Sequence, residues 1–179
     1  HSLDQARQSG LFDCIVVSSD SQIILQLAED WGVNHTIDRP EWLATDTAAK
    51  LPVIQHNFRI AETLTGITFD TVVDLDATSP LRNQEDLKGA IELLESREQI
   101  ANVITGAPAR RSPYFNLVEL DESGTVHLSG KRRSINKRIV RRQDAPPCYD
   151  INASIYVWRR NTLLNANKVI QPNTRLYVM

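Results

Sequence analysis

Two carboxylates, two hydroxyls and a guanidinium cluster around the end of one apolar segment. The segment Thr71–Leu75 is rich in β-branched residues, and the polar side chains lie at its end or just beyond it: Asp74, Asp76, Thr78, Ser79 and Arg82. In open parallel sheets, ligands bind beyond the carboxyl ends of the strands. A buried strand that delivers these side chains to such an edge predicts a site for a nucleotide or a metal ion.

The two carboxylates have several possible roles. Asp74 and Asp76 are two residues apart, so on a strand they point to the same face, where they could hold a hard divalent cation. Alternatively, one caps the following turn and the other is solvated. An Asp-x-Asp after an apolar strand is also typical of nucleotide-sugar glycosyltransferases, so the pattern leaves the enzyme class open. In the next residues, the hydroxyls and the planar fork of Arg82 could bind phosphate or sugar oxygens, or simply form a turn before a helix.

A basic segment stands out from an otherwise acidic chain. Residues 131–142 contain seven Lys and Arg and no acid, and since the whole chain carries a net charge of −2, the remainder carries −9. Nucleic acid is the usual partner of such a segment. However, the segment has no aromatic residue for base stacking, and the acidic remainder would repel a duplex. We therefore expect no nucleic-acid partner; Arg141 and Arg142 would bind a small polyanion or a partner subunit.

The elements around these residues alternate in type over the first half of the chain. Apolar segments at 12–18, 34–37, 71–75 and 101–106 predict strands, and helical patterns precede or separate them at 1–10, 21–31, 46–60 and 83–94. This order predicts an α/β fold with a mostly parallel sheet and helices on both faces. The second half predicts a hairpin at 114–120 and 125–128, a basic loop, and strands at 151–158 and 176–179.

Length and composition fit one soluble domain. The chain has 179 residues, of which 41% are hydrophobic and 23% charged. No apolar run approaches the roughly 18 residues of a membrane helix, so we expect no membrane association. Two distant cysteines fit a reducing compartment, which predicts a cytoplasmic location. All seven glycines are isolated, so we expect a phosphate-binding loop, and the strand that should precede the first helix, to lie upstream of His1 if the protein binds a nucleoside triphosphate.

Five motifs in order resemble one enzyme family. They are Val-Val-Ser-Ser-Asp at 16–20, Arg-Pro-Glu-Trp-Leu-Ala-Thr-Asp at 39–46, Val-Val-Asp-Leu-Asp-Ala-Thr-Ser-Pro-Leu-Arg at 72–82, Arg-Arg-Gln-Asp-Ala-Pro-Pro at 141–147 and Asn-Ala-Ser-Ile-Tyr-Val at 152–157. Together they resemble the acylneuraminate cytidylyltransferases, or CMP-sialic acid synthetases, over essentially the whole chain.

The resemblance implies a fold, a reaction and an assembly. The fold is a single nucleotidyl-transferase α/β domain over residues 1–179, with a hairpin and basic arm at 116–152 that reaches the partner in a homodimer. In the reaction, a nine-carbon 2-keto sugar acid attacks the α-phosphorus of CTP with its anomeric hydroxyl. Pyrophosphate leaves, and Mg²⁺ stabilises the transferring phosphate. Such activated sugars serve the synthesis of surface glycans such as lipopolysaccharide or capsule.

The resemblance also implies roles for individual residues. The catalytic residues are Asp76 and Arg142. The nucleotide-binding residues are Arg39, Ala48, Lys50 and Leu75. The sugar-binding residues are Asp76, Ser79, Arg142, Gln143, Asp150, Asn152 and Tyr156, and Arg142 pairs with the sugar carboxylate or a phosphate. The metal ligands are not implied, and Asp74 and Asp76 remain candidates.

The chain departs from the family pattern at four of its positions. The family usually has Ser or Thr at Lys50, Gln at Asp76, Arg at Asp150 and Gly at Ala153. Two added acids and one lost Arg favour a substrate that bears an amine, or simply a nonulosonic acid other than N-acetylneuraminate. The family's phosphate motif would precede His1 and its metal motif would follow Met179, so we expect the chain to be a fragment. Two alternatives stay open: a glycosyltransferase that binds metal through Asp74 and Asp76, and a non-catalytic dimerisation or binding module.

Overall fold

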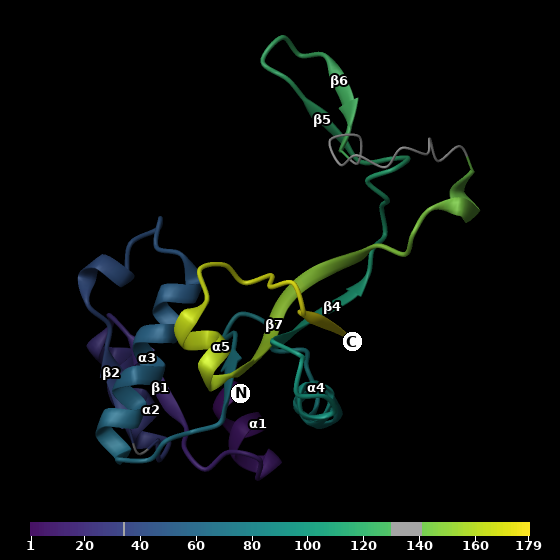
Figure 1. Cartoon of the computed structure of the whole chain (residues 1–179). Coiled ribbons are helices and arrows are strands. Elements are labelled where there is room, and N and C mark those ends of the chain that lie inside the picture. Colours follow the sequence, from purple (N-terminus) through teal and green to yellow (C-terminus); the bar gives the residue numbers. More distant parts are fainter. Residues whose placement is uncertain (34, 130–140) are drawn as a thin grey trace. The chain divides into compact units, whose positions relative to one another are not determined.

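The computed structural model describes residues 1–33, 35–129 and 141–179. The contacts divide these residues into two units (Figure 1). The first unit comprises His1–Thr105 and Ala153–Tyr177, the second comprises Gly106–Asn152, and the last two residues are divided between them. The predicted arm at 116–152 falls within the second unit, and its role in dimerisation stays a prediction.

The first unit begins with the predicted alternation of helices and strands. Helix α1 (Ser2–Ser9) leads to strand β1 (Val16–Ser19), and α2 (Gln22–Asp30) connects β1 to β2 (His35–Asp38). The two strands are parallel, with Val16 opposite His35, and α2 packs against both. The first strand is shorter than the predicted 12–18, because residues 12–15 join no ladder in the described part of the chain.

Helix α3 (Lys50–Thr65) follows a short 3-10 turn, η1 (Glu41–Leu43). The prediction that residue 46 or 47 caps this helix is wrong. Its N-cap is Ala49, which makes no side-chain cap hydrogen bond. The intervening residues form a turn instead, in which the Ala48 amide donates to the Thr45 carbonyl at 3.0 Å. Lys50 therefore becomes the first residue of the helix.

The remaining strands of the first unit form a four-stranded sheet in the order β3-β7-β4-β8. Their bounds are β3 (Thr71–Leu75), β4 (Asn102–Pro108), β7 (Tyr149–Arg159) and β8 (Arg175–Val178). Because β7 lies between β3 and β4 and runs antiparallel to β3, the predicted mostly parallel sheet is wrong and the sheets are mixed. An apolar strand has the same composition in either direction, so composition did not reveal this reversal.

Helices cover both faces of β7, as predicted. Trp158 and Tyr156 belong to a core cluster with α3 residues such as Phe58, whereas Ile155 and Val157 belong to a second cluster. That second cluster contains the apolar face of α4 (Gln84–Glu95). The alternation of side chains along a strand places adjacent residues in separate cores. Beyond β7, the short helix α5 (Arg160–Asn165) was not predicted.

The second unit contains the predicted hairpin. Strands β5 (Val118–Leu120) and β6 (Val126–Leu128) are antiparallel, and Asp121 accepts hydrogen bonds from the Ser123 and Thr125 amides in the turn between them. The 3-10 turn η3 (Arg142–Asp144) precedes β7. Residues 131–140 of the basic segment lie outside the described residues. None of the described helices has the length and hydrophobicity to span a bilayer.

Candidate functional site

A cavity of about 1,140 Å³ in the first unit gathers residues that end its strands. Its walls include Ser18 of β1, Arg39 just after β2, Asp76 just after β3, and Lys50 at the start of α3. All four residues predicted to bind nucleotide line it, together with both Asp residues of the Asp-x-Asp: Arg39, Ala48, Lys50, Leu75, Asp74 and Asp76. Side chains that are far apart in sequence are therefore brought to one place.

The centre of this site is an ammonium group held by two carboxylates. Lys50 Nζ lies 2.9 Å from Asp74 Oδ2 and 3.1 Å from Asp76 Oδ2. It also lies 4.6 Å from the centre of the Tyr156 ring, a cation–π contact. The three charged side chains are each between a quarter and a third exposed, so a ligand in the cavity can reach them.

The surroundings keep this cluster ionised at neutral pH. Burial lowers the pKa of Lys50, but the two carboxylates raise it, and the net pKa lies above the ordinary value. Burial raises the pKa of Asp76, but hydrogen bonds from Thr78 and Lys50 lower it, and the net pKa lies below the ordinary value. The pKa of Tyr156 is raised, chiefly by burial. Lys50, Asp74 and Asp76 thus form a unit with a net charge of −1 and one oriented cation.

The Asp-x-Asp pair does not fit a magnesium ion as the structure places it. Mg²⁺ requires near-octahedral oxygen ligands at about 2.0–2.1 Å. Here one oxygen of each carboxylate contacts the same ammonium group instead. Within the described residues, no three His, Cys, Asp or Glu side chains gather in an arrangement that could hold a metal ion. We therefore derive no step through a metal bound by Asp74 and Asp76.

Arg39 links the ends of the two parallel strands. Its guanidinium donates to the Ser18 carbonyl at 2.6 Å and to the Ser18 hydroxyl at 3.3 Å, and its backbone amide donates to the Ser19 carbonyl at 2.9 Å. These bonds fix the half-buried guanidinium at the edge of the cavity, where its remaining N–H groups can contact a ligand. Among these contacts, the role of Ser18 was missed from sequence, although it lies within the first quoted motif.

The turn after β3 is built by Asp76 and Arg82. Asp76 Oδ1 accepts from the Thr78 amide at 2.8 Å and from its hydroxyl at 2.6 Å. Arg82 is 3% exposed, and its guanidinium donates to the Asp76 and Ser79 carbonyls at 2.8 Å each. Of the two sequence interpretations of Arg82, the structure favours the turn. Ser79 is half-buried within that turn.

The other predicted sugar-binding residues are divided between the two units. Tyr156 is 7% exposed and lies beside Lys50. In the second unit, Gln143 and Asp150 are exposed and Asn152 is half-buried. The side chain of Arg142 lies outside the described residues. The convergence of these residues on Asp76 stays a prediction.

Comparison with known proteins decides the class. A family model described as "Cytidylyltransferase" matches residues 1–170. The chain belongs to the cytidylyltransferase family. It is 41% identical to CMP-N,N'-diacetyllegionaminic acid synthase of Campylobacter jejuni over all 179 residues, which cover 73% of that enzyme. It is 28% identical to an N-acylneuraminate cytidylyltransferase of Streptococcus agalactiae over the whole chain and 41% of that protein.

Solved structures support the fold of this cytidylyltransferase. One is a CMP:2-keto-3-deoxy-manno-octonic acid synthetase in complex with CTP, with a TM-score of 0.59 at 12% identity over 99% of this chain and 78% of that one. A second is a 4-diphosphocytidyl-2C-methyl-D-erythritol synthase from Anaerococcus prevotii, with a TM-score of 0.57 at 13% identity over 99% and 74% of the two chains. The resemblance inferred from the five motifs is thus confirmed, including its nucleotidyl-transferase α/β fold.

Proposed function

We propose that this cytidylyltransferase transfers CMP from CTP to the anomeric hydroxyl of a sialic-acid-like nonulosonic acid and releases pyrophosphate. The observation that carries the proposal is the single cavity that gathers Arg39, Ala48, Lys50, Leu75 and Asp76. Similarity over the whole chain to enzymes named for nonulosonic acid substrates supports the sugar class.

The residues of the cavity suggest how the nucleotide is held. Arg39 and the turn at Ala48 would contact the cytosine, since both line the cavity next to β1 and β2. The Lys50 ammonium, oriented by Asp74 and Asp76, would contact a phosphate oxygen. A fixed cation stabilises the negative charge that develops on a transferring phosphoryl group, and it needs no reorganisation during the reaction. Positioning and charge are the main demands of such a transfer.

The sugar acid would bind next to Asp76. Asp76 and Ser79 lie where nucleotide and sugar would meet, and Tyr156 lies beside Lys50. Arg142 would pair with the sugar carboxylate through its planar fork, joined by Gln143, Asp150 and Asn152. We also propose a homodimer formed through residues 116–152, a magnesium requirement whose ligands are not Asp74 and Asp76, a cytoplasmic location, and a role in surface glycan synthesis.

A coupled assay tests the proposal. The protein is incubated with Mg²⁺, N,N'-diacetyllegionaminic acid or N-acetylneuraminic acid, and one nucleoside triphosphate at a time, and pyrophosphate is measured. We expect release with CTP and a nonulosonic acid together, and little with ATP, GTP or UTP or without sugar. Hydrolysis of a nucleotide-sugar without pyrophosphate release would contradict the proposal and favour a glycosyltransferase. Omitting Mg²⁺ tests the metal requirement in the same assay.

A further inference from the structure

Two strands of the first unit each have one unpaired edge. Among the described residues, β1 pairs only with β2, and β3 pairs only with β7. Edge strands of natural proteins are usually protected by charged residues, prolines or bulges. The sequences of β1 (Val-Val-Ser-Ser) and β3 (Thr-Val-Val-Asp-Leu) contain no lysine and no proline. Both resemble interior strands rather than edge strands.

The hydrogen bonds show which groups of β3 point away from β7. The Asp76 amide donates to the Ser154 carbonyl at 3.1 Å, and the Arg160 amide donates to the Asp70 carbonyl at 2.8 Å. In an antiparallel ladder, alternate residues direct their backbone groups to the same neighbour. Even-numbered residues of β3 therefore face β7. The residues whose amides and carbonyls face the other edge are Thr71, Val73 and Leu75.

The same reasoning applies to β1. The Ser19 carbonyl accepts the Arg39 amide beyond β2, so Val17 and Ser19 direct their backbone groups to β2. Val16 and Ser18 then direct theirs to the opposite edge. The Ser18 carbonyl accepts the Arg39 guanidinium there, at the end of the strand.

The two unpaired edges line the same cavity. Val16, Val17 and Ser18 of β1 and all five residues of β3 belong to the wall of the 1,140 Å³ cavity. Large apolar side chains that are 41–54% exposed line it as well: Leu11, Ile24, Leu27, Trp31 and Ile67. Clustered apolar exposure around a cavity marks a surface that another segment covers.

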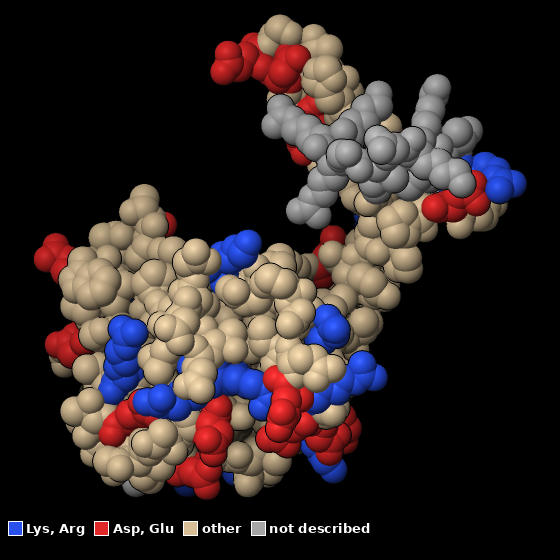
Figure 2. Space-filling view, viewed as in Figure 1, with Lys and Arg blue, Asp and Glu red and all other residues tan. Residues whose placement is uncertain are grey.

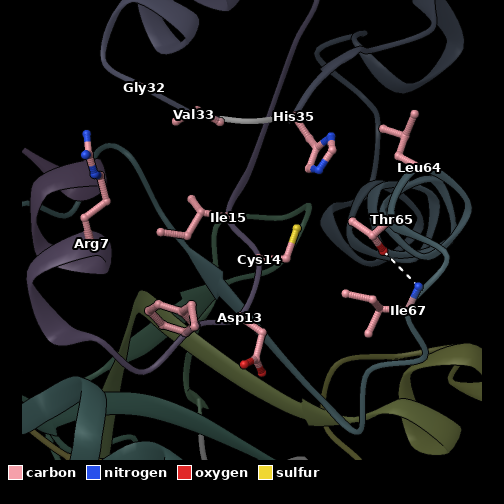
Figure 3. Close-up of a pocket in the computed structure, with 11 residues that line it drawn as sticks. Arg7, Asp13, Cys14, Ile15, Gly32, Val33, His35, Leu64, Thr65 and Ile67 are labelled. Atoms are coloured by element: carbon pink, nitrogen blue, oxygen red, sulfur yellow. Dashed lines mark hydrogen bonds between the residues drawn. The ribbon is translucent and has the colours of Figure 1, made fainter.

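A second cavity, of about 540 Å³, adjoins the first (Figure 3). Both cavities are lined by Phe12, Asp13, Cys14, Ile15 and Ile67. The segment that leads into β1 therefore has open space on more than one side. On the face shown in Figure 2, acidic and basic side chains are intermixed over the first unit, so the apolar cavity differs from the surface around it.

We infer that one extended, apolar strand of this protein, supplied by polypeptide ahead of His1, fills the space between β1 and β3. It would pair with both edges and join the two sheets in the order β2-β1-new strand-β3-β7-β4-β8. The unpaired edge of β3 is five residues long, so the new strand needs about five residues, a common strand length.

Three observations favour this occupant. His1, Ser2 and Leu3 line the cavity, so polypeptide that enters α1 starts beside it. The two relatives that are 41% identical each contain further sequence, since this chain covers 73% of their length. A strand followed by α1 and then β1 is a crossover unit, which places the new strand parallel and adjacent to β1.

A strand with neighbours on both sides belongs to the interior of a sheet. A second copy of the chain would have to insert a segment between two strands of a folded unit, which is less favourable than supplying the strand in the same chain. The new strand would end next to Ser18 and Arg39. It would therefore border the candidate site and fix the distance between Arg39 and Asp76, which lie on opposite sides of the space.

Hydrogen exchange tests the inference. Residues 1–179 are compared with the same chain extended by the natural residues that its gene encodes ahead of His1. In the extended chain we expect amide exchange in segments 16–18 and 71–75 to slow by about 100-fold, as for amides that become ladder hydrogen bonds. Segment 118–128, the β5–β6 hairpin, serves as the internal control and is expected not to change. A matched variant replaces two apolar residues of the added segment by Asp, and we expect it to lose the protection.

Three results would overturn the inference. One is unchanged exchange in the extended chain. Another is protection in residues 1–179 that rises with protein concentration, which would identify a second copy as the occupant. The third is a gene that encodes no apolar run of five residues ahead of His1. CTP binding by calorimetry is measured on the same samples: protection without CTP binding would contradict the proposed function and leave this inference standing.

Discussion

Replacing Lys50 with Met tests the charge cluster at the centre of the site. The substitution keeps a long unbranched side chain but removes the ammonium that lies 2.9 Å from Asp74 and 3.1 Å from Asp76. Removing one partner of a fully buried ion pair costs about 3–5 kcal/mol. The three side chains here are 26–33% exposed, so solvent screens part of the loss, and we expect the free energy of unfolding to fall by about 1–2 kcal/mol.

The pH dependence of this loss follows from the pKa shifts. The pKa of Asp76 is lowered in the folded state, so its contribution is present above its unfolded pKa and is lost as the pH falls through the folded value. The pKa of Lys50 is raised, so its contribution is present below its unfolded pKa and is lost as the pH rises through the folded value. The difference between the native protein and Lys50→Met should therefore be largest from about pH 5 to pH 9 and shrink below about pH 4.

Urea unfolding at pH 7.5 and pH 3.5 measures this difference. The control is Lys88→Met, because Lys88 pairs with Glu92 at 3.7 Å and both side chains are more than 60% exposed. We expect the control to change stability by at most about 0.5 kcal/mol at either pH. If Lys50→Met matched the control at pH 7.5, or lost as much stability at pH 3.5 as at pH 7.5, the reasoning on this cluster would be refuted.

Three further substitutions test other parts of the molecule. Asn83→Ala removes the capping box with Asp86 and should lower the free energy of unfolding by about 1 kcal/mol, measured by urea unfolding; an unchanged midpoint would contradict the capping role. Ala153→Gly should raise the thermal midpoint, because Ala153 has a φ of 55° and this left-handed conformation costs a non-glycine residue about 1–2 kcal/mol; a lower midpoint would show that the strain is absent. Arg142→Ala should raise the KM for the sugar acid about ten-fold and leave the KM for CTP unchanged, with Arg141→Ala as the control; equal effects on both substrates would assign Arg142 to the phosphate.

Local signals in the sequence predicted local structure well. The β-branched run predicted β3 with its observed bounds, and Asn83 three residues before Asp86 predicted the capping box of α4. Both depend on residues that are adjacent or three apart, so propensity and hydrogen-bond geometry suffice. The start of α3 was missed because Asp46 and Thr47 are good caps by composition, yet the turn that ends at Ala48 uses these residues first.

Long-range pairing could not be predicted in the same way. The direction of β7 depends on a chain reversal through the second unit, which leaves no mark in the composition of the strand. Similarly, Lys50 and Asp74 are 24 residues apart, and their contact requires α3 to begin at residue 50 and β3 to end at residue 75. The family resemblance placed both residues near the nucleotide, but it did not show that they bind each other.

The charge cluster also bears on which sugar the site prefers. The added acid at Asp76 favoured a substrate with an amine, but in the structure both carboxylate oxygens of Asp76 are engaged. Oδ2 contacts Lys50, and Oδ1 accepts two hydrogen bonds from Thr78. An amine would have to displace one of these donors, so the structure favours the other alternative, a nonulosonic acid without a free amine. We therefore expect Asp76→Gln to leave the ratio of kcat/KM for an N-acetylated sugar acid and its amino analogue within about two-fold, which corresponds to about 0.4 kcal/mol. A change of ten-fold or more in favour of the acetylated sugar would show that Asp76 does bind a substrate amine.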